Sequence, residues 1–107
     1  MADTLKRYMQ VITGGGNTNV MGTAASTKTL LSCQIMNTSS TDITFDLYAH
    51  NSTSDHAILN NQSLPANATF IFNSKVVFEG SGEYLMVDPS AAVSAIHVVT
   101  SYLDQTS

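Results

Sequence analysis

The stretch "TDITFDLYAHN" (residues 41–51) decides the fold class. Apolar Ile43, Phe45 and Leu47 occupy every second position, and polar residues fill the positions between them. Successive side chains of a β-strand point to opposite faces of its sheet. This period of two therefore predicts a strand with one buried and one solvated face.

The preceding stretch, "KTLLSCQIMN" (residues 28–37), has the same character. Alternation here places Leu31, Cys33 and Ile35 on one face and Leu30 on the other. Turn-forming residues, "NTSSTD", connect the two runs. Two alternating strands joined by such a short polar connection predict an antiparallel hairpin.

Further β-rich runs follow, and proline- or glycine-containing turns separate them. The runs are "HAILNN" (56–61), "TFIFN" (69–73), "KVVFEG" (75–80), "EYLMVD" (83–88) and "AAVSAIHVVTSYLD" (91–104). About seven or eight short strands with turn signals between them are typical of sandwiches and jelly rolls. We therefore predict an all-β fold, a single antiparallel β-sandwich of jelly-roll type.

The glycine run in "VITGGGNTNVMG" (residues 11–22) raises the question of a phosphate-binding loop. A P-loop requires a Lys and a Ser or Thr after its last glycine and a helix beyond, whereas Asn, Thr and Asn follow the run here. Adjacent glycines instead permit a sharp bend. We interpret Gly14, Gly15 and Gly16 as a hinge in an N-terminal arm (1–27), which precedes a sandwich body (28–107).

The arm is rich in large apolar residues, which a small domain cannot easily bury alone. One interpretation is that the arm clamps a neighbouring subunit, by strand exchange or a related contact. The other is that it supplies the first strand of its own sheet. Under the first interpretation the predicted assembly interface consists of Leu5, Tyr8, Met9, Val11, Ile12, Val20 and Met21.

Few residues could form a chemical site. The spacing of His50, His56 and His97 matches no metal motif, and no Gly-x-Ser-x-Gly elbow presents a nucleophilic serine. The single cysteine, Cys33, falls on a predicted core face, where a thiol behaves as a small apolar group. We predict no catalytic residue, no cofactor and no metal.

Charge and hydropathy exclude other classes of partner. Four Lys and Arg against eight Asp and Glu give a net charge of −4, which argues against a surface for nucleic acid. No apolar run approaches the roughly 18 residues that span a bilayer. The first ten residues also lack the apolar core of a signal peptide. We therefore expect neither nucleic acid nor membrane as a partner, and no secretion by a signal peptide.

Short motifs between residues 28 and 104 resemble a family of small bacteriophage virion proteins. They comprise a strand that ends in Asn, a Leu-Pro-Ala turn, and a glycine-bounded turn before an alternating strand. The residues that carry the resemblance are Asn37, Pro65, Ala66, Gly82, Leu85 and Val87. The family pattern has glycine after Pro-Ala, where this chain has Asn67, and the arm lies outside the match.

The resemblance implies a non-enzymatic β-sandwich present in many copies in a virion. We therefore expect a capsid decoration or cement protein, assembled in the host cytoplasm. Its expected partners are the major capsid protein or other virion proteins and further copies of itself, for example in a trimer. The alternatives are a tail or neck component, or a carbohydrate-binding module that recognises host glycans through Tyr48, Tyr84 and Tyr102.

Overall fold

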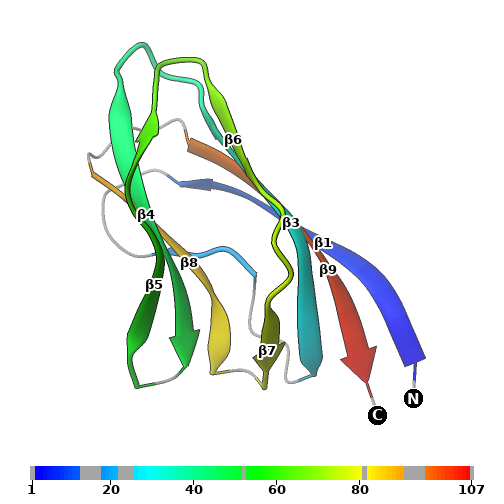
Figure 1. The fold of residues 1–107 in the computed structure, drawn as a ribbon. Helices are drawn as coiled ribbons and strands as arrows, with labels where there is room; N and C mark the ends of the chain where they lie inside the picture. Colours follow the sequence, from blue (N-terminus) through cyan, green and yellow to red (C-terminus); the bar gives the residue numbers. More distant parts are fainter. Residues whose placement is uncertain are drawn as a thin grey trace.

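Two antiparallel sheets pack face to face and form a β-sandwich (Figure 1). The computed structural model describes residues 2–12, 18–21, 26–51, 53–80, 82–90 and 96–106. The five-stranded sheet has the order β1-β9-β3-β6, with β7 also paired to β3, and the four-stranded sheet has the order β2-β8-β4-β5. This architecture confirms the predicted all-β sandwich. The strands are β1 (Ala2–Ile12), β2 (Thr18–Asn19), β3 (Thr27–Asn37), β4 (Ile43–Asn51), β5 (Asp55–Leu64), β6 (Thr69–Phe72), β7 (Val77–Glu79), β8 (Glu83–Pro89) and β9 (Ile96–Thr106).

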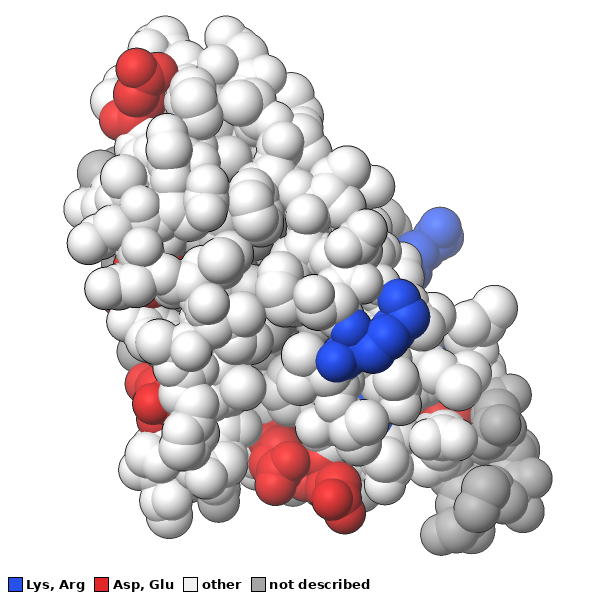
Figure 2. Space-filling view, viewed as in Figure 1, with Lys and Arg blue, Asp and Glu red and all other residues white. Residues whose placement is uncertain are grey.

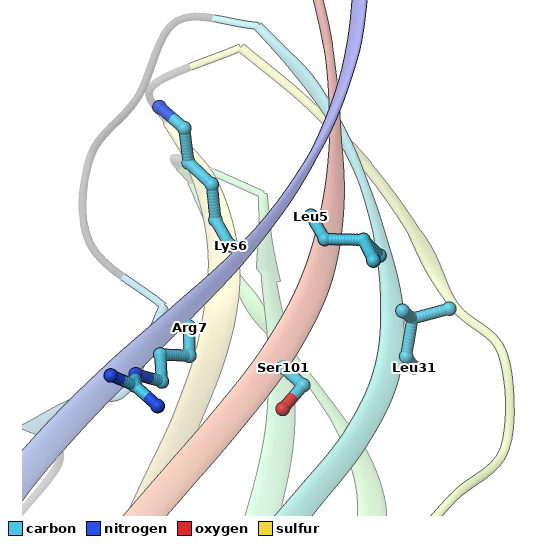
Figure 3. A pocket seen from close by; sticks show the side chains of 5 residues that line it. All are labelled: Leu5, Lys6, Arg7, Leu31 and Ser101. Carbon is cyan, nitrogen blue, oxygen red and sulfur yellow. The ribbon is translucent and has the colours of Figure 1, made fainter.

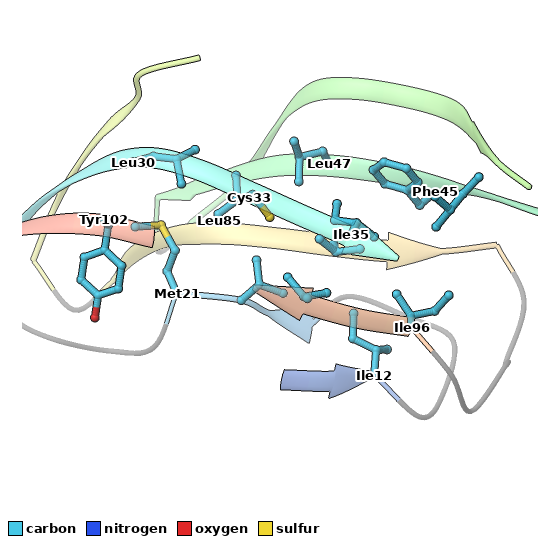
Figure 4. Close-up of a cluster of buried hydrophobic side chains, with 14 of the residues drawn as sticks. Ile12, Met21, Leu30, Cys33, Ile35, Phe45, Leu47, Leu85, Ile96 and Tyr102 are labelled. Atoms are coloured by element: carbon cyan, nitrogen blue, oxygen red, sulfur yellow. The ribbon is translucent and has the colours of Figure 1, made fainter. Parts of the chain in front are cut away.

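The alternation in β4 has the predicted effect. Ile43, Phe45 and Leu47 are buried between the sheets, and the ring of Phe45 meets Phe70 of the opposite sheet edge-on, with 5.5 Å between centroids. Figure 4 shows the buried side chains of both sheets meeting in one cluster. The inward positions of the strands therefore form a single core.

The predicted hairpin between residues 28–37 and 43–51 is wrong. β3 pairs with β6, β7 and β9 in one sheet, whereas β4 pairs with β5 and β8 in the other. The connection after Asn37 thus crosses from sheet to sheet. Both strands carry an apolar face, and such a face is buried equally well in either sheet of a sandwich, so alternation alone does not determine which strands pair.

The predicted facing of Leu30 and Leu31 in β3 is wrong, because the strand contains a β-bulge. The register with β9 shifts between Leu30 and Ser32, so that Leu30 and Cys33 are both buried although they lie three positions apart. Leu31, predicted on the core face, is only half-buried. An extra residue in a strand reverses the facing of everything beyond it.

Asn37 fixes the corner at which the chain leaves β3. Its side chain is fully buried, and Nδ2 donates to the Thr41 carbonyl at 2.7 Å and to the Leu64 carbonyl at 3.1 Å. Its Oδ1 accepts from the Ser39 amide at 3.0 Å. One amide side chain thus satisfies the turn and ties it to the end of β5.

Asn67, which replaces the glycine of the family pattern, has a backbone conformation suited to that replacement. Its φ is +61°, in the left-handed region that glycine adopts freely and asparagine tolerates better than most residues. The Ala68 amide closes the turn by donating to the Pro65 carbonyl at 3.1 Å. The departure from the pattern therefore preserves the turn.

The first strand belongs to the sheet of its own chain. β1 pairs with β9 without interruption from Ala2↔Thr106 to Ile12↔Ile96, which is the second of the two arrangements weighed for this segment. The proposed hinge at Gly14–Gly16 lies outside the described residues. Exchange of the segment between copies, and a division of the chain at residue 28, stay predictions.

Candidate assembly surface

The seven predicted interface residues fall into two groups. Ile12, Val20 and Met21 are buried in the core of their own chain, and in this arrangement they are unavailable to a neighbour. Leu5, Met9, Val11 and Tyr8 remain exposed on β1. Tyr8 pairs with the buried Thr100 of β9, so its side chain points to the core side of the sheet. It nevertheless remains exposed, because it is not covered by the core.

The other three β1 residues belong to a larger apolar surface. Opposite residues of paired strands share a face, and alternate residues do not. The inward residues of β9 are buried, so the remaining positions of β9 and their partners on β1 and β3 point outward. We call the outward apolar set of the five-stranded sheet the apolar face; it comprises Leu5, Met9, Val11, Leu31, Met36, Ile71, Val77, Val99 and Leu103.

Two hollows lie along β1 on this side. The larger, about 680 Å³, is lined by Leu5, Lys6, Arg7, Leu31 and Ser101. In Figure 3 the Leu5 side chain reaches across β9 toward Leu31 of β3. The smaller hollow, about 260 Å³, is lined mainly by apolar residues, Met9, Val11 and Val99 among them. The strands β1, β9 and β3 thus form a surface of ridges and depressions, in which the apolar side chains lie beside polar ones such as Arg7 and Ser101.

The outer face of the four-stranded sheet is polar by comparison. Tyr48 donates its hydroxyl proton to Asp46 Oδ2 at 3.0 Å, and this hydrogen bond raises the pKa of Tyr48. His50 lies 2.6 Å from Asp55 through Nδ1, and its ring packs against Tyr84 with 4.8 Å between centroids. Figure 2 shows that charged side chains are sparse across the visible side of the molecule.

The groups considered for metal binding or nucleophilic chemistry do not come together. Within the described part of the chain, no three His, Cys, Asp or Glu side chains form a group that could hold a metal ion. His56 contacts Asn51 and Ser54 at the end of the β4–β5 hairpin, while His97 lies on β9. Burial raises the pKa of the Cys33 thiol to about 11, so the thiol is protonated at neutral pH and shielded from reagents.

A partly buried ionic cluster joins three strands at one end of the sandwich, and sequence reasoning missed it. Lys28 is fully buried and its Nζ donates to the Gly80 carbonyl at 2.9 Å. Lys6 Nζ of β1 lies 3.3 Å from Asp104 Oδ2 of β9, and Asp104 is 2% exposed. Burial lowers the pKa of Lys28, although Asp104 and Glu83 oppose this effect.

Asp104 makes the stability of the fold dependent on pH. The nearby Ser26 hydroxyl and then Lys6 and Lys28 hold the pKa of Asp104 below its usual 3.8. Among the residues that the structure describes, no group forms a hydrogen bond with Ser26 Oγ, so the contact of Asp104 with Lys6 at 3.3 Å is the better supported of these interactions. Because the folded state favours the carboxylate, Asp104 stabilises the fold above about pH 4, and this contribution is lost as the pH falls through the lowered pKa.

We therefore expect Asp104→Asn to be clearly less stable than the wild type at pH 7 and much closer to it at pH 2.5. Urea denaturation at the two pH values measures this difference. Glu79→Gln, at an exposed carboxylate of β7, serves as the control for a general effect of charge. An equal deficit of Asp104→Asn at both pH values would contradict the pKa argument.

Comparisons with known proteins support the fold. No family model and no curated protein matches the sequence. Among solved structures, a chain of the T13 infectious bursal disease virus particle superposes with a TM-score of 0.54 at 9% identity, covering 94% of this chain and 30% of that one. A chain of the Gx strain of the same virus gives a TM-score of 0.51 at 11% identity, covering 94% and 32%.

In fold, this chain resembles part of each of these two chains of viral particles. It spans about a third of the length of the two viral chains, and the similarity does not single out bacteriophages. In the described part of the chain, no helix is long and apolar enough to cross a membrane.

Proposed function

We propose that this chain is a non-enzymatic structural protein of a virion, and that it decorates or cements the capsid of a bacteriophage. The observation that carries the proposal is the similarity of its sandwich to chains of viral particles, over 94% of its length. The motif resemblance to small phage virion proteins supports the narrower assignment.

The mechanism would be mechanical. A cement protein covers junctions between shell subunits and stabilises them by removing apolar surface from water, at about 25 cal/mol per Å². The apolar face is exposed in the single chain, with Leu5 75% and Met9 62% exposed, and copies that associate through it would link the shell subunits to which each copy is bound. The major capsid protein and other virion proteins are the proposed partners, and the virion is the proposed location.

The test is quantitative mass spectrometry of purified particles, with the copy number of this chain set against that of the major shell protein. We expect a ratio near one, or one copy for each triplet of shell subunits. A ratio of a few per cent would place the chain in the tail or neck instead. Its absence from particles would overturn the virion proposal.

A second candidate function is the binding of host glycans, which one observation favours. Tyr84 and His50 pair across β8 and β4, and Tyr48 and Asp46 lie beside them on the same outer face. Aromatic rings and carboxylates together are groups that can pack against and hydrogen-bond a sugar. A glycan array probed with the wild type and with Tyr84→Ala tests this candidate; no signal above background from the wild type would eliminate it.

A further inference from the structure

The outer face of the five-stranded sheet carries more exposed large apolar residues than the outer face of the four-stranded sheet does. Outward residues of a sandwich are normally polar, in alternation with the inward apolar ones. The four-stranded sheet follows this rule with Thr44, Asp46 and Tyr48. The five-stranded sheet departs from it, because each of its strands carries large apolar residues among the polar ones on the outward side, and Leu5, Met9 and Ile71 are more than half exposed. Exposed apolar surface of this extent marks a face that another molecule covers.

We propose that the apolar face packs against the same face of a second copy of this chain, related by a two-fold axis. The proposal deepens the virion role and rests on it for its biological setting. It names the partner and the surface, and it extends the predicted interface from β1 to β9, β3, β6 and β7.

The size of the face suits a stable dimer. Four strands stand abreast across it (β1, β9, β3 and then β6 or β7), and β9 and β3 are each 11 residues long. With about 4.8 Å between strands and about 3.3 Å per residue, the face measures roughly 19 by 36 Å, or about 700 Å². A standard interface buries about 800 Å² on each partner.

The charges on the face are compatible with self-association. Among the outward side chains that the structure describes on these strands, Arg7 and Glu79 carry the formal charges. They lie on opposite edge strands, β1 and β7. A two-fold axis parallel to the strands places β1 of one copy over β6 and β7 of the other, so the edge with Arg7 meets the edge with Glu79. Neither residue meets its own symmetry mate.

The protruding side chains and the hollows of the apolar face allow two copies to interdigitate. Met9 and Ile71 protrude at the two edges, with 62% and 55% of their surfaces exposed, and the hollows beside β1 lie between Leu5 and Leu31 and between Met9 and Val99. Under the same axis, Ile71 of one copy faces β1 and its hollows in the other. Stacked sheets pack about 10 Å apart, close enough for such side chains to interlock.

The test is sedimentation equilibrium of the purified chain at about 100 μM, because interfaces of this size give a Kd of ~1 μM or tighter. We expect the wild type to have the mass of a dimer. Met9→Lys and Ile71→Lys should each raise the dimer Kd by at least about tenfold, since each buries an unpaired charge in an apolar interface. Ala57→Lys, on the exposed outer side of the other sheet, is the matched control and should remain dimeric. Circular dichroism confirms that each variant is folded.

The outcomes separate this proposal from its rivals. A monomeric wild type, or a trimer, overturns it. A dimer that Met9→Lys dissociates but Ile71→Lys leaves intact also overturns it, because that result indicates pairing of two β1 edges rather than of two faces. The copy number in particles is a separate measurement. A dimer that is absent from particles would therefore overturn the virion role and leave the interface standing.

Discussion

Phe45→Ala is expected to lower the free energy of unfolding by about 3–5 kcal/mol, the usual cost of truncating a buried aromatic residue to alanine. Phe45 is 1% exposed on β4 and meets Phe70 of β6 across the space between the sheets. The substitution removes this contact and leaves a cavity that two stacked sheets cannot easily close. Since a domain has about 5–15 kcal/mol of stability in total, the variant should be close to unfolding at room temperature.

Urea denaturation followed by circular dichroism measures this loss. Phe45→Leu keeps most of the apolar volume and should cost clearly less than Phe45→Ala. Thr69→Ala, an exposed residue beside Phe70, is the control and should stay within about 0.5 kcal/mol of the wild type. A loss under about 1 kcal/mol for Phe45→Ala would mean that the two sheets do not meet at this position.

Asn37→Ala is expected to cost about 2–4 kcal/mol, because hydrogen bonds worth about 1 kcal/mol each disappear and the carbonyl of the buried Leu64 loses a donor. The Nδ2 group of Asn37 is a donor to both Thr41 and Leu64, and the two carbonyl oxygens belong to separate elements. Without this side chain the crossing from β3 to β4 loses one of its links to β5, although Ile43 still pairs with Leu64.

Asn37→Asp sharpens the test. It keeps the shape of the side chain but directs a carboxylate oxygen at the same two carbonyl groups. The folded state then disfavours the charged form, so the pKa of the new carboxyl is raised and the variant should gain stability relative to the wild type as the pH falls from 7 to 4. Ser40→Ala, exposed in the same connection, should behave as the wild type in urea denaturation at both pH values. A pH-independent deficit for Asn37→Asp would contradict the expected repulsion between the carboxylate and the two carbonyl groups.

The sequence predicts the sandwich well because period-two patterns report which face of a strand is buried. In β4 the pattern identifies every inward residue from Ile43 to Leu47. It does not report which strands are neighbours, since an inward face satisfies the same pattern in either sheet. The predicted hairpin failed for this reason. The facing of Leu31 failed because nothing in "TLLSC" indicates where the extra residue of a bulge lies.

The candidate site was predicted only at its β1 edge. Leu5, Met9 and Val11 were identified as apolar residues in a segment of uncertain placement. Ile71 and Val77 were missed because their runs, "TFIF" and "KVVF", are apolar at nearly every position, so alternation cannot separate inward from outward residues. Lys28 was missed as a buried residue because lysine is almost never fully buried without a partner, and its acceptor, Gly80, lies 52 positions along the chain.

The pairing of β1 with β9 affects the order in which the strands join the five-stranded sheet. β1 is synthesised before any other strand described here, and its partner in the sheet is the last. β1 and its apolar residues therefore lack their partner strand, β9, while the strands between them are synthesised. Closure of the five-stranded sheet, and with it the apolar face, becomes a late step, dominated by the slow search for a distant contact. The surface proposed to join two copies is therefore incomplete until β9 has been synthesised and has paired with β1 and β3.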